Sequence, residues 1–339
     1  MAPLRLVDVV FGAMAAKVVY AAAELRVADL LAEGVQTSEE LAERTGTHGP
    51  SLRRLVRALA GMGVLTQTGA ERFQLVPARP TAPRRRARLG PRAGADAPWT
   101  GILAELGRAG CPSVRTGETG WERAHGMPLY QLYERLPEQS ATFNAAMAQQ
   151  TRAVAPAIIA AYDFSRFGTV VDVGGGDGTF LAELLHAHPD LHGVLFDLPA
   201  GLAGAAGTLT AAGVADRCQV VPGDFFASVP GGADAYAMKQ ILHNWDDERA
   251  IAVLRNCREA MAPTARLVVL ERVLPELVSV DDRQSEALLL DIQMLVVAGG
   301  RERTEQEFRS LLDAAGFTLT ALTEPLPPHG YRVIEGTPA

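Results

Sequence analysis

The sequence predicts an α/β fold in which a mostly parallel sheet ends in an antiparallel C-terminal hairpin and follows a separate α-helical domain. Short apolar segments alternate with helical patterns over residues 169–270, which is typical of parallel strands joined by crossover helices. The last two strand segments, 317–323 and 331–335, are joined by residues 324–330. This connection is too short for a crossover helix, so the two strands are expected to pair antiparallel. At 339 residues the chain is also too long for one ordinary core.

Residues 1–98 carry the pattern of a winged-helix-like domain. Apolar residues recur at helical spacing over 20–31, and Thr37, followed by a serine and two glutamates, is typical of the N-terminus of a second helix. The segment 61–73 ends a third helix and supplies a short strand pair. That third helix is expected over 51–59, where the apolar residues share one face: Leu52, Leu55, Val56 and Leu59.

Three arginines of this third helix, Arg53, Arg54 and Arg57, could enter a DNA groove. The same arginines are equally typical of a solvated helix face. A net charge of −7 argues against a chain that grips phosphate backbones. We therefore expect no nucleic-acid partner.

The amino-acid composition and the apolar spacing change twice in the middle of the chain. Residues 76–98 are rich in proline, arginine, alanine and glycine and read as a linker. Residues 99–161 form a helical segment in which Phe143, Met147 and Val154 share one apolar face. The expected domains are therefore 1–98, a helical linker over 99–161, and an α/β domain over 162–339.

The parallel strands are expected in this last domain, at Thr169–Val173, Gly193–Asp197, Cys218–Val221, Ala233–Met238 and Arg266–Leu270. Open parallel sheets bind ligands at the carboxyl ends of their strands. This edge of the sheet is therefore the predicted site.

Composition limits the class of protein. The chain is 48% hydrophobic and 21% charged, as globular proteins are. Its three cysteines have neither metal nor disulfide spacing. Charged residues interrupt the apolar N-terminus well short of the roughly 20 apolar residues that span a membrane. These features predict a cytoplasmic protein without a metal or a membrane partner.

The strongest local signal is a glycine-rich loop after the first predicted parallel strand. Gly174 and Gly176 permit a tight turn and let a ligand approach the amides at a helix N-terminus. The spacing differs from the G-x-G-x-x-G of nicotinamide enzymes, because Thr179 stands where the third glycine belongs. At the end of the next strand, Asp197 is placed to accept hydrogen bonds from ribose hydroxyls. Loop and acid together predict an adenosine-containing cofactor.

The following strand ends extend this site. Asp224 and Phe225 follow the third strand and could face an adenine ring, although Asp224 could also be a simple helix cap. The fourth strand leads to His243, which is therefore expected to point at the same edge. Three other histidines are expected at a helix C-terminus and not at a metal: His186, His188 and His192.

With these motifs in place, the C-terminal half resembles the small-molecule O-methyltransferases, including plant caffeate-type and bacterial antibiotic-biosynthesis enzymes. The resemblance rests on six segments in the family's order: Asp-Val-Gly-Gly-Gly at 172–176, Asp-Leu-Pro at 197–199, Gly-Asp-Phe-Phe at 223–226, His-Asn-Trp-Asp-Asp at 243–247, Glu-Arg-Val-Leu-Pro at 271–275 and Gly-Gly-Arg-Glu-Arg-Thr at 299–304. It implies a Rossmann-like methyltransferase sheet and an N-terminal domain that serves dimerisation, and hence a homodimer. It weakens between residues 76 and 111.

The same resemblance implies S-adenosylmethionine as the cofactor and S-adenosylhomocysteine as its product. The residues it assigns to the cofactor are Gly174, Gly176, Asp197, Leu198, Asp224, Phe225, Lys239 and Trp245.

For catalysis, the resemblance implies that His243 is the general base and that Glu271 and Glu302 orient it. A phenol of pKa about 10 is mostly protonated at neutral pH, and a histidine of pKa about 6.5 can accept its proton. The expected acceptor is a small aromatic or polyketide-type molecule. The substrate-side residues are Phe143, Met147, Asn244 and Met294, of which the first, second and fourth are equally explained by helix packing. Asn244 departs from the acid common beside this histidine.

Two alternatives stay open. A member of this family could bind the cofactor yet carry out hydroxylation or decarboxylation. A winged-helix regulator could instead sense a metabolite through its C-terminal domain.

Overall fold

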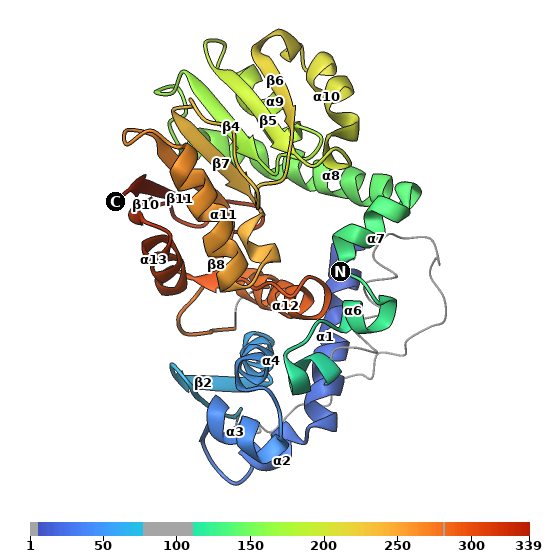
Figure 1. Cartoon of the computed structure of the whole chain (residues 1–339). Coiled ribbons are helices and arrows are strands. Elements are labelled where there is room, and N and C mark those ends of the chain that lie inside the picture. The colour runs from blue at the N-terminus through green and yellow to red at the C-terminus, as the bar shows by residue number, and fades with distance from the viewer. Residues whose placement is uncertain (1–5, 77–110, 281) are drawn as a thin grey trace, which may run out of the picture. The chain divides into compact units, whose positions relative to one another are not determined.

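The computed structural model describes residues 6–76, 111–280 and 282–339 (Figure 1). The chain divides into two compact units, Met1–Leu129 with Pro275–Gly299, and Tyr130–Leu274 with Gly300–Ala339. We call them the N-terminal unit and the sheet unit. The expected domain boundaries after residues 98 and 161 stay predictions, and the expected linker lies outside the described residues except for Val76.

The N-terminal unit combines helices with a small sheet. Its helices are α1 (Leu6–Glu24), α2 (Val27–Leu31), α3 (Ser38–Thr45), α4 (Gly49–Gly61), α6 (Gly120–His125) and α12 (Asp282–Val297). The strands β1 (Gln36–Thr37), β3 (Arg72–Leu75) and β2 (Leu65–Gly69) lie in that order and pair antiparallel. Thr37 caps α3, because its side chain accepts a hydrogen bond from the Glu40 amide and the Glu40 carboxylate accepts one from the Thr37 amide. The predicted cap and strand pair are thus confirmed.

One helix prediction is wrong. Residues 20–31 form no single helix, since α1 and α2 are separated at Arg26, which has a φ of 57°. This left-handed conformation is incompatible with a continuous right-handed helix. The spacing of apolar residues carries no signal for such a break.

The arginines of α4 are occupied within the N-terminal unit. Guanidinium nitrogens of Arg53 and Arg54 lie 2.7 and 2.9 Å from carboxylate oxygens of Glu71 and Asp291, respectively. Arg57 is only 3% exposed and donates to a backbone carbonyl, so the solvated-face interpretation is wrong for this residue. The side chains that could have met DNA therefore bind groups of their own unit.

The sheet unit contains the predicted sheet, with strands in the order β10-β11-β8-β7-β4-β5-β6. Strands β8, β7, β4, β5 and β6 pair in parallel, β11 pairs antiparallel with β8 and β10, and β9 pairs in parallel with β8. All seven predicted strands and the antiparallel hairpin are confirmed. The bounds are β4 (Thr169–Val173), β5 (His192–Asp197), β6 (Cys218–Pro222), β7 (Ala235–Lys239), β8 (Arg266–Leu274), β9 (Arg303–Thr304), β10 (Phe317–Leu322) and β11 (Tyr331–Pro338).

Two apolar cores cover the two faces of this sheet. Helices α8, α9 and α10 cover one face of the sheet, and α11 and α13 cover the other (Figure 1). Ala235 and Ala237 of β7 pack in the core with the first three helices, whereas Tyr236 and Met238 pack in the core with α11 and α13. Burial of successive residues explains why β4, β7 and β8 are continuous apolar runs in the sequence. The helices are α7 (Leu129–Arg135), α8 (Pro137–Ala161), α9 (Thr179–Ala187), α10 (Ala205–Ala211), α11 (Asp247–Ala260) and α13 (Glu305–Ala314), with short 3-10 turns η1 (Gly201–Gly204), η2 (Ala215–Arg217) and η3 (Leu242–Asn244).

No helix within the described ranges is long and apolar enough to cross a membrane.

Candidate active site

The glycine-rich loop follows β4 and leads into α9. Gly174 and Gly176 have φ angles of 73° and 59°, a conformation that residues with a side chain rarely adopt. A Cβ at Gly174 would also lie 2.4 Å from Cδ1 of Ile241, whereas the space beside Gly176 is open. The local backbone therefore requires glycine here and leaves room for a ligand to approach it.

Carboxylates of β4 and β5 lie at this loop. Asp197 accepts hydrogen bonds from the amides of Gly176 at 2.8 Å and Leu198 at 2.6 Å. Asp172 is 1% exposed, and neither of its carboxylate oxygens has a hydrogen-bond partner among the described residues. Burial raises the pKa of Asp172 to about 7, although the positive charge of Lys239 opposes this rise. Buried polar groups normally have partners, so Asp172 is suited to a cationic ligand, a role that the sequence analysis did not assign.

An aromatic group lies beyond the ends of β6 and β7. The Trp245 ring lies 6.2 Å from Phe225, 4.8 Å from Phe226 and 6.0 Å from Tyr130, measured between ring centroids. Tyr130 comes from α7, which precedes the sheet in sequence, and was not among the predicted site residues. Only the tertiary packing of α7 brings it here.

Other predicted cofactor residues have local roles as well. Asp224 is exposed, and its carboxylate accepts a hydrogen bond from the Phe226 amide at 2.8 Å; residues 225–227 form a turn and not a helix, so the helix-cap alternative is wrong. Leu198 is 39% exposed. Burial lowers the pKa of Lys239 to about 8, and its Nζ donates to Oε1 of Gln240 at 3.0 Å. These contacts leave the proposed cofactor roles of the three residues untested.

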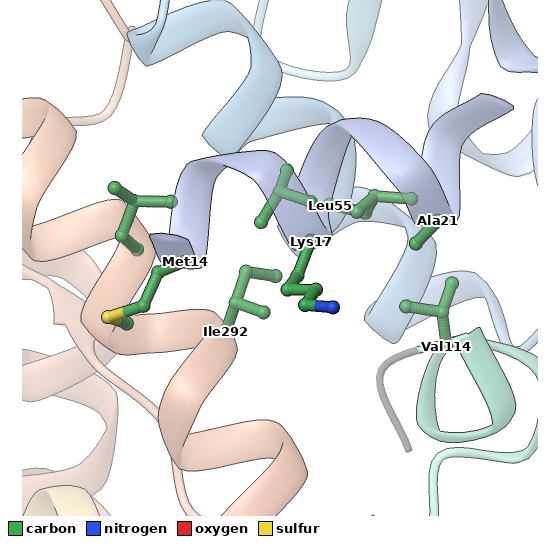
Figure 2. Close-up of a pocket in the computed structure, with 8 residues that line it drawn as sticks. Met14, Lys17, Ala21, Leu55, Val114 and Ile292 are labelled. Carbon is green, nitrogen blue, oxygen red and sulfur yellow. The ribbon is translucent and has the colours of Figure 1, made fainter. Parts of the chain in front are cut away.

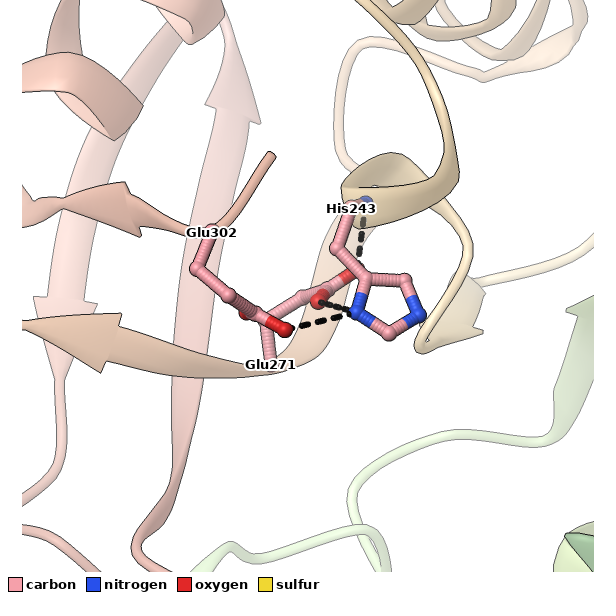
Figure 3. Close-up of side chains that lie close together, drawn as sticks. All are labelled: His243, Glu271 and Glu302. Atoms are coloured by element: carbon pink, nitrogen blue, oxygen red, sulfur yellow. Dashed lines mark hydrogen bonds and ion pairs between the residues drawn. The ribbon is translucent and has the colours of Figure 1, made fainter. Parts of the chain in front are cut away.

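His243 meets both predicted glutamates. It lies in η3, just after β7, while Glu271 belongs to β8 and Glu302 directly precedes β9. Nδ1 of His243 lies 2.9 Å from Oε1 of Glu302 and 3.8 Å from Oε2 of Glu271, and the His243 amide donates to Oε1 of Glu271 at 3.3 Å (Figure 3). Among the described residues no group hydrogen-bonds Nε2. Since 11% of the His243 side chain is exposed, Nε2 is the ring nitrogen available to a ligand.

The pKa values of Glu271 and Glu302 are shifted in opposite directions within this cluster. Burial alone would lower the pKa of His243, but Glu271 and Glu302 outweigh it and hold the pKa above its ordinary value. Burial raises the pKa of Glu271. It would also raise that of Glu302, but the attraction and hydrogen bond of His243 bring the pKa of Glu302 below its ordinary value. Glu302 is therefore the ionised partner of the imidazole.

The three side chains could also hold a metal ion, because one ligand atom from each lies within 4.8 Å of the others. The expectation of a metal-free enzyme stays a prediction.

The substrate-side residues lie on several elements. Asn244 in η3 donates from Nδ2 to the Gln240 carbonyl at 3.0 Å and so closes the turn before His243. On α8, Phe143 has its ring centroid 5.0 Å from that of Tyr133, and Met147 is half-buried. Met294 belongs to α12 of the N-terminal unit, where it is buried. None of these contacts tests substrate binding.

The histidine-rich segment was only partly predicted. His186 and His188 lie at the C-terminus of α9 as expected, but His192 is the first residue of β5. The prediction is wrong for His192 because α9 ends before Pro189, which cannot continue a helix.

A pocket in the N-terminal unit contains none of the predicted site residues. Its lining comes mainly from α1, α4 and α12 and is apolar except for Lys17 (Figure 2).

Comparisons with known proteins match nearly the whole chain. Residues 111–318 match the model of the O-methyltransferase domain, and residues 7–78 match that of the O-methyltransferase dimerisation domain. The chain is 39% identical to the O-demethylpuromycin-O-methyltransferase of Streptomyces alboniger, over 98% of this chain and 89% of that protein. It is 36% identical to the aclacinomycin 10-hydroxylase RdmB of Streptomyces purpurascens, over 88% of this chain and 80% of that protein.

Solved structures agree with this assignment. An O-methyltransferase from neocarzinostatin biosynthesis, in complex with S-adenosylmethionine and 2-hydroxy-5-methyl naphthoic acid, is 32% identical. The similarity covers 100% of this chain and 99% of that one, with a TM-score of 0.64. The predicted resemblance is confirmed: this chain belongs to the S-adenosylmethionine-dependent O-methyltransferase family, with a dimerisation domain ahead of its O-methyltransferase domain.

Proposed function

We propose that this enzyme methylates a phenolic hydroxyl of a small aromatic or polyketide-type natural product and that His243 is its general base. The observation that carries the proposal is the orientation of His243. Its Nδ1 is held 2.9 Å from the Glu302 carboxylate, and Nε2 has no partner among the described residues. A base needs one accessible nitrogen and a partner that fixes its tautomer.

The site fits S-adenosylmethionine by the chemistry of its donors. The cofactor carries a sulfonium and an ammonium, and Asp172 offers buried carboxylate oxygens that lack hydrogen-bond partners within the described chain. Asp197 lies at the loop where an adenosine ribose would be bound, and the space beside Gly176 is open. When bound, S-adenosylmethionine supplies an electrophilic methyl group and S-adenosylhomocysteine is its product. We assign Gly174, Gly176, Asp197, Leu198, Asp224, Phe225, Lys239 and Trp245 to its binding.

Three side chains of the enzyme, His243, Glu302 and Glu271, accept the proton of the acceptor hydroxyl or stabilise it once it is transferred. Nε2 of His243 accepts the hydroxyl proton as the oxygen becomes nucleophilic, and the resulting imidazolium is stabilised by Glu302. Glu271 fixes the backbone of His243 through its bond to the amide and adds a second carboxyl beside Nδ1. The phenol thus need not ionise in bulk water before transfer.

The proposal also covers the metal content, the cellular location, the oligomeric state and the acceptor-side residues of the enzyme. We infer a metal-free, cytoplasmic homodimer with Phe143, Met147, Asn244 and Met294 on the acceptor side. The dimerisation domain supports the homodimer, and the naphthoic acid bound by the neocarzinostatin enzyme supports an aromatic acceptor.

The test is an assay of the purified enzyme with S-adenosylmethionine and a panel of phenols, quinones and polyketide aromatics, read by mass. One added methyl and an equal amount of S-adenosylhomocysteine are expected. A hydroxylated or decarboxylated product without S-adenosylhomocysteine would instead establish the second candidate function, which the relative named as a hydroxylase favours.

A further inference from the structure

The segment that contains Glu302 also holds the backbone around His243. The amide of Arg301 donates to the His243 carbonyl at 2.9 Å. Gly300 approaches the same carbonyl so closely that a Cβ there would lie 2.1 Å from its oxygen. Residues 300–302 therefore contact both the ring and the main chain of His243.

Arg303 extends this contact on both sides of His243. Its Nη1 donates to the Leu242 carbonyl at 3.0 Å, and its Nη2 donates to the Trp245 carbonyl at 2.9 Å. These carbonyls belong to the residue before His243 and to the second residue after it. The guanidinium thus spans the turn that carries the imidazole.

A third partner fixes the direction of the guanidinium. Oδ1 of Asp247, at the start of α11, accepts from Nε of Arg303 at 2.9 Å and from Nη2 at 2.7 Å. The Arg303 side chain is 1% exposed, whereas that of Asp247 is 54% exposed. Only the planar fork of an arginine presents donors in these directions at once, and a lysine in the same place cannot.

The charge of Arg303 also acts on the acids of the site. Burial alone would raise the pKa of Glu302, whereas His243, then Arg272 and, least of these, Arg303 lower it. A buried cation here favours the ionised carboxylate that His243 needs.

We propose that Arg303 is a positioning residue for the methyl transfer. It holds the turn Leu242–Asn244 in the orientation in which Nδ1 of His243 meets Glu302 and Nε2 stays open to the acceptor. This inference rests on the proposed role of His243 as general base. A residue that served only folding would affect stability without a selective effect on the chemical step.

The test compares R303K and R303M with the wild type and with R309M. Arg309 pairs with Glu305 on the exposed surface of α13, so R309M removes an arginine ion pair away from the site. R303K should lower kcat roughly 10- to 100-fold, the scale of a misplaced reacting group, with little change in KM or in cofactor affinity by calorimetry. R309M should match the wild type.

The dependence of kcat/KM on pH distinguishes the hydrogen-bonding geometry of Arg303 from its positive charge. R303K retains the positive charge, so the acid limb of kcat/KM should stay near its wild-type position. R303M removes a buried cation while His243 still holds Glu302 in its ionised form, so the imidazolium becomes more favourable and the acid limb should move to higher pH. A loss of stability alone would produce neither the selective fall in kcat nor this difference between the two variants.

Activities of H243Q, R303K and the H243Q/R303K double variant show whether His243 is the base and whether Arg303 acts through it. If His243 is the base, adding R303K to H243Q should cause no further loss, because the two changes act through one group. Wild-type activity of H243Q would overturn the proposed function. Low activity of H243Q together with wild-type kcat of R303K would overturn the inference alone.

If both Arg303 variants fail to fold, the D247A variant provides the test. The Asp247 side chain is half-exposed, so water can take its place and the variant is expected to fold. A folded D247A should show a smaller fall in kcat at constant KM. An unchanged kcat would overturn the role of Arg303.

Discussion

Replacing Glu302 by glutamine tests which carboxylate supports His243. In E302Q the side-chain oxygen can still accept a hydrogen bond from Nδ1, but the negative charge is lost. The bond is 2.9 Å long, and the Glu302 side chain is 1% exposed, so water cannot replace the charge. Hydrogen bonds to charged groups contribute about 1.5–3 kcal/mol. At about 1.36 kcal/mol for each factor of ten, kcat/KM should fall roughly 10- to 150-fold.

The assay is kcat/KM for methyl transfer as a function of pH. Loss of the carboxylate destabilises the imidazolium, so the pKa of His243 should fall and the acid limb should move to lower pH. E302Q should therefore be slower than the wild type near neutral pH, yet lose its remaining activity only at a lower pH.

E271Q is the matched control for this prediction. Glu271 lies 3.8 Å from Nδ1, beyond hydrogen-bond distance, so a glutamine should cost less activity there than at Glu302, which lies at 2.9 Å. Wild-type activity of E302Q, a shift of its acid limb to higher pH, or a larger loss in E271Q would show that Glu302 is not the charged partner of His243.

Three further predictions concern the pH response, the loop and the cofactor. Wild-type kcat/KM should decline as pH falls through a midpoint above about 6.5, because His243 must be neutral to act and its carboxylate neighbours raise its pKa; a midpoint below this value would contradict the prediction. G174A should lose about 1–2 kcal/mol of stability in denaturant unfolding, since its φ of 73° is left-handed, whereas G207A, in a helix with open space around it, should lose none. D197N keeps an acceptor for the Gly176 amide but loses its charge, so calorimetry should show roughly tenfold weaker S-adenosylmethionine binding; unchanged affinity would remove Asp197 from the cofactor site.

Much of the sheet unit could be predicted because its local signals and its tertiary structure agree. Strands β4, β7 and β8 are buried on both faces, so they appear as apolar runs, and the hairpin is evident because residues 324–330 are too few for a crossover. The order of motifs along parallel strands also placed Asp197 and His243 at one edge, since the carboxyl ends of such strands lie together.

Other features of the site and the fold depend on tertiary contacts that the spacing of residues along the sequence does not reveal. Nothing in the sequence distinguishes the glutamate at 2.9 Å from the one at 3.8 Å. Arg303 resembles any surface arginine until its carbonyl partners are seen, and the burial of Arg57 follows from packing within its unit. The helix break at Arg26 depends on one left-handed dihedral angle, which the spacing of apolar residues does not reveal.

We propose that His243 removes the proton of the acceptor hydroxyl. The most direct measurement is methyl transfer by H243Q, combined with calorimetric binding of S-adenosylmethionine to the same variant. Cofactor binding should persist while kcat falls roughly 100-fold or more, the scale of losing a general base. Turnover equal to that of the wild type, with the cofactor bound, would contradict it.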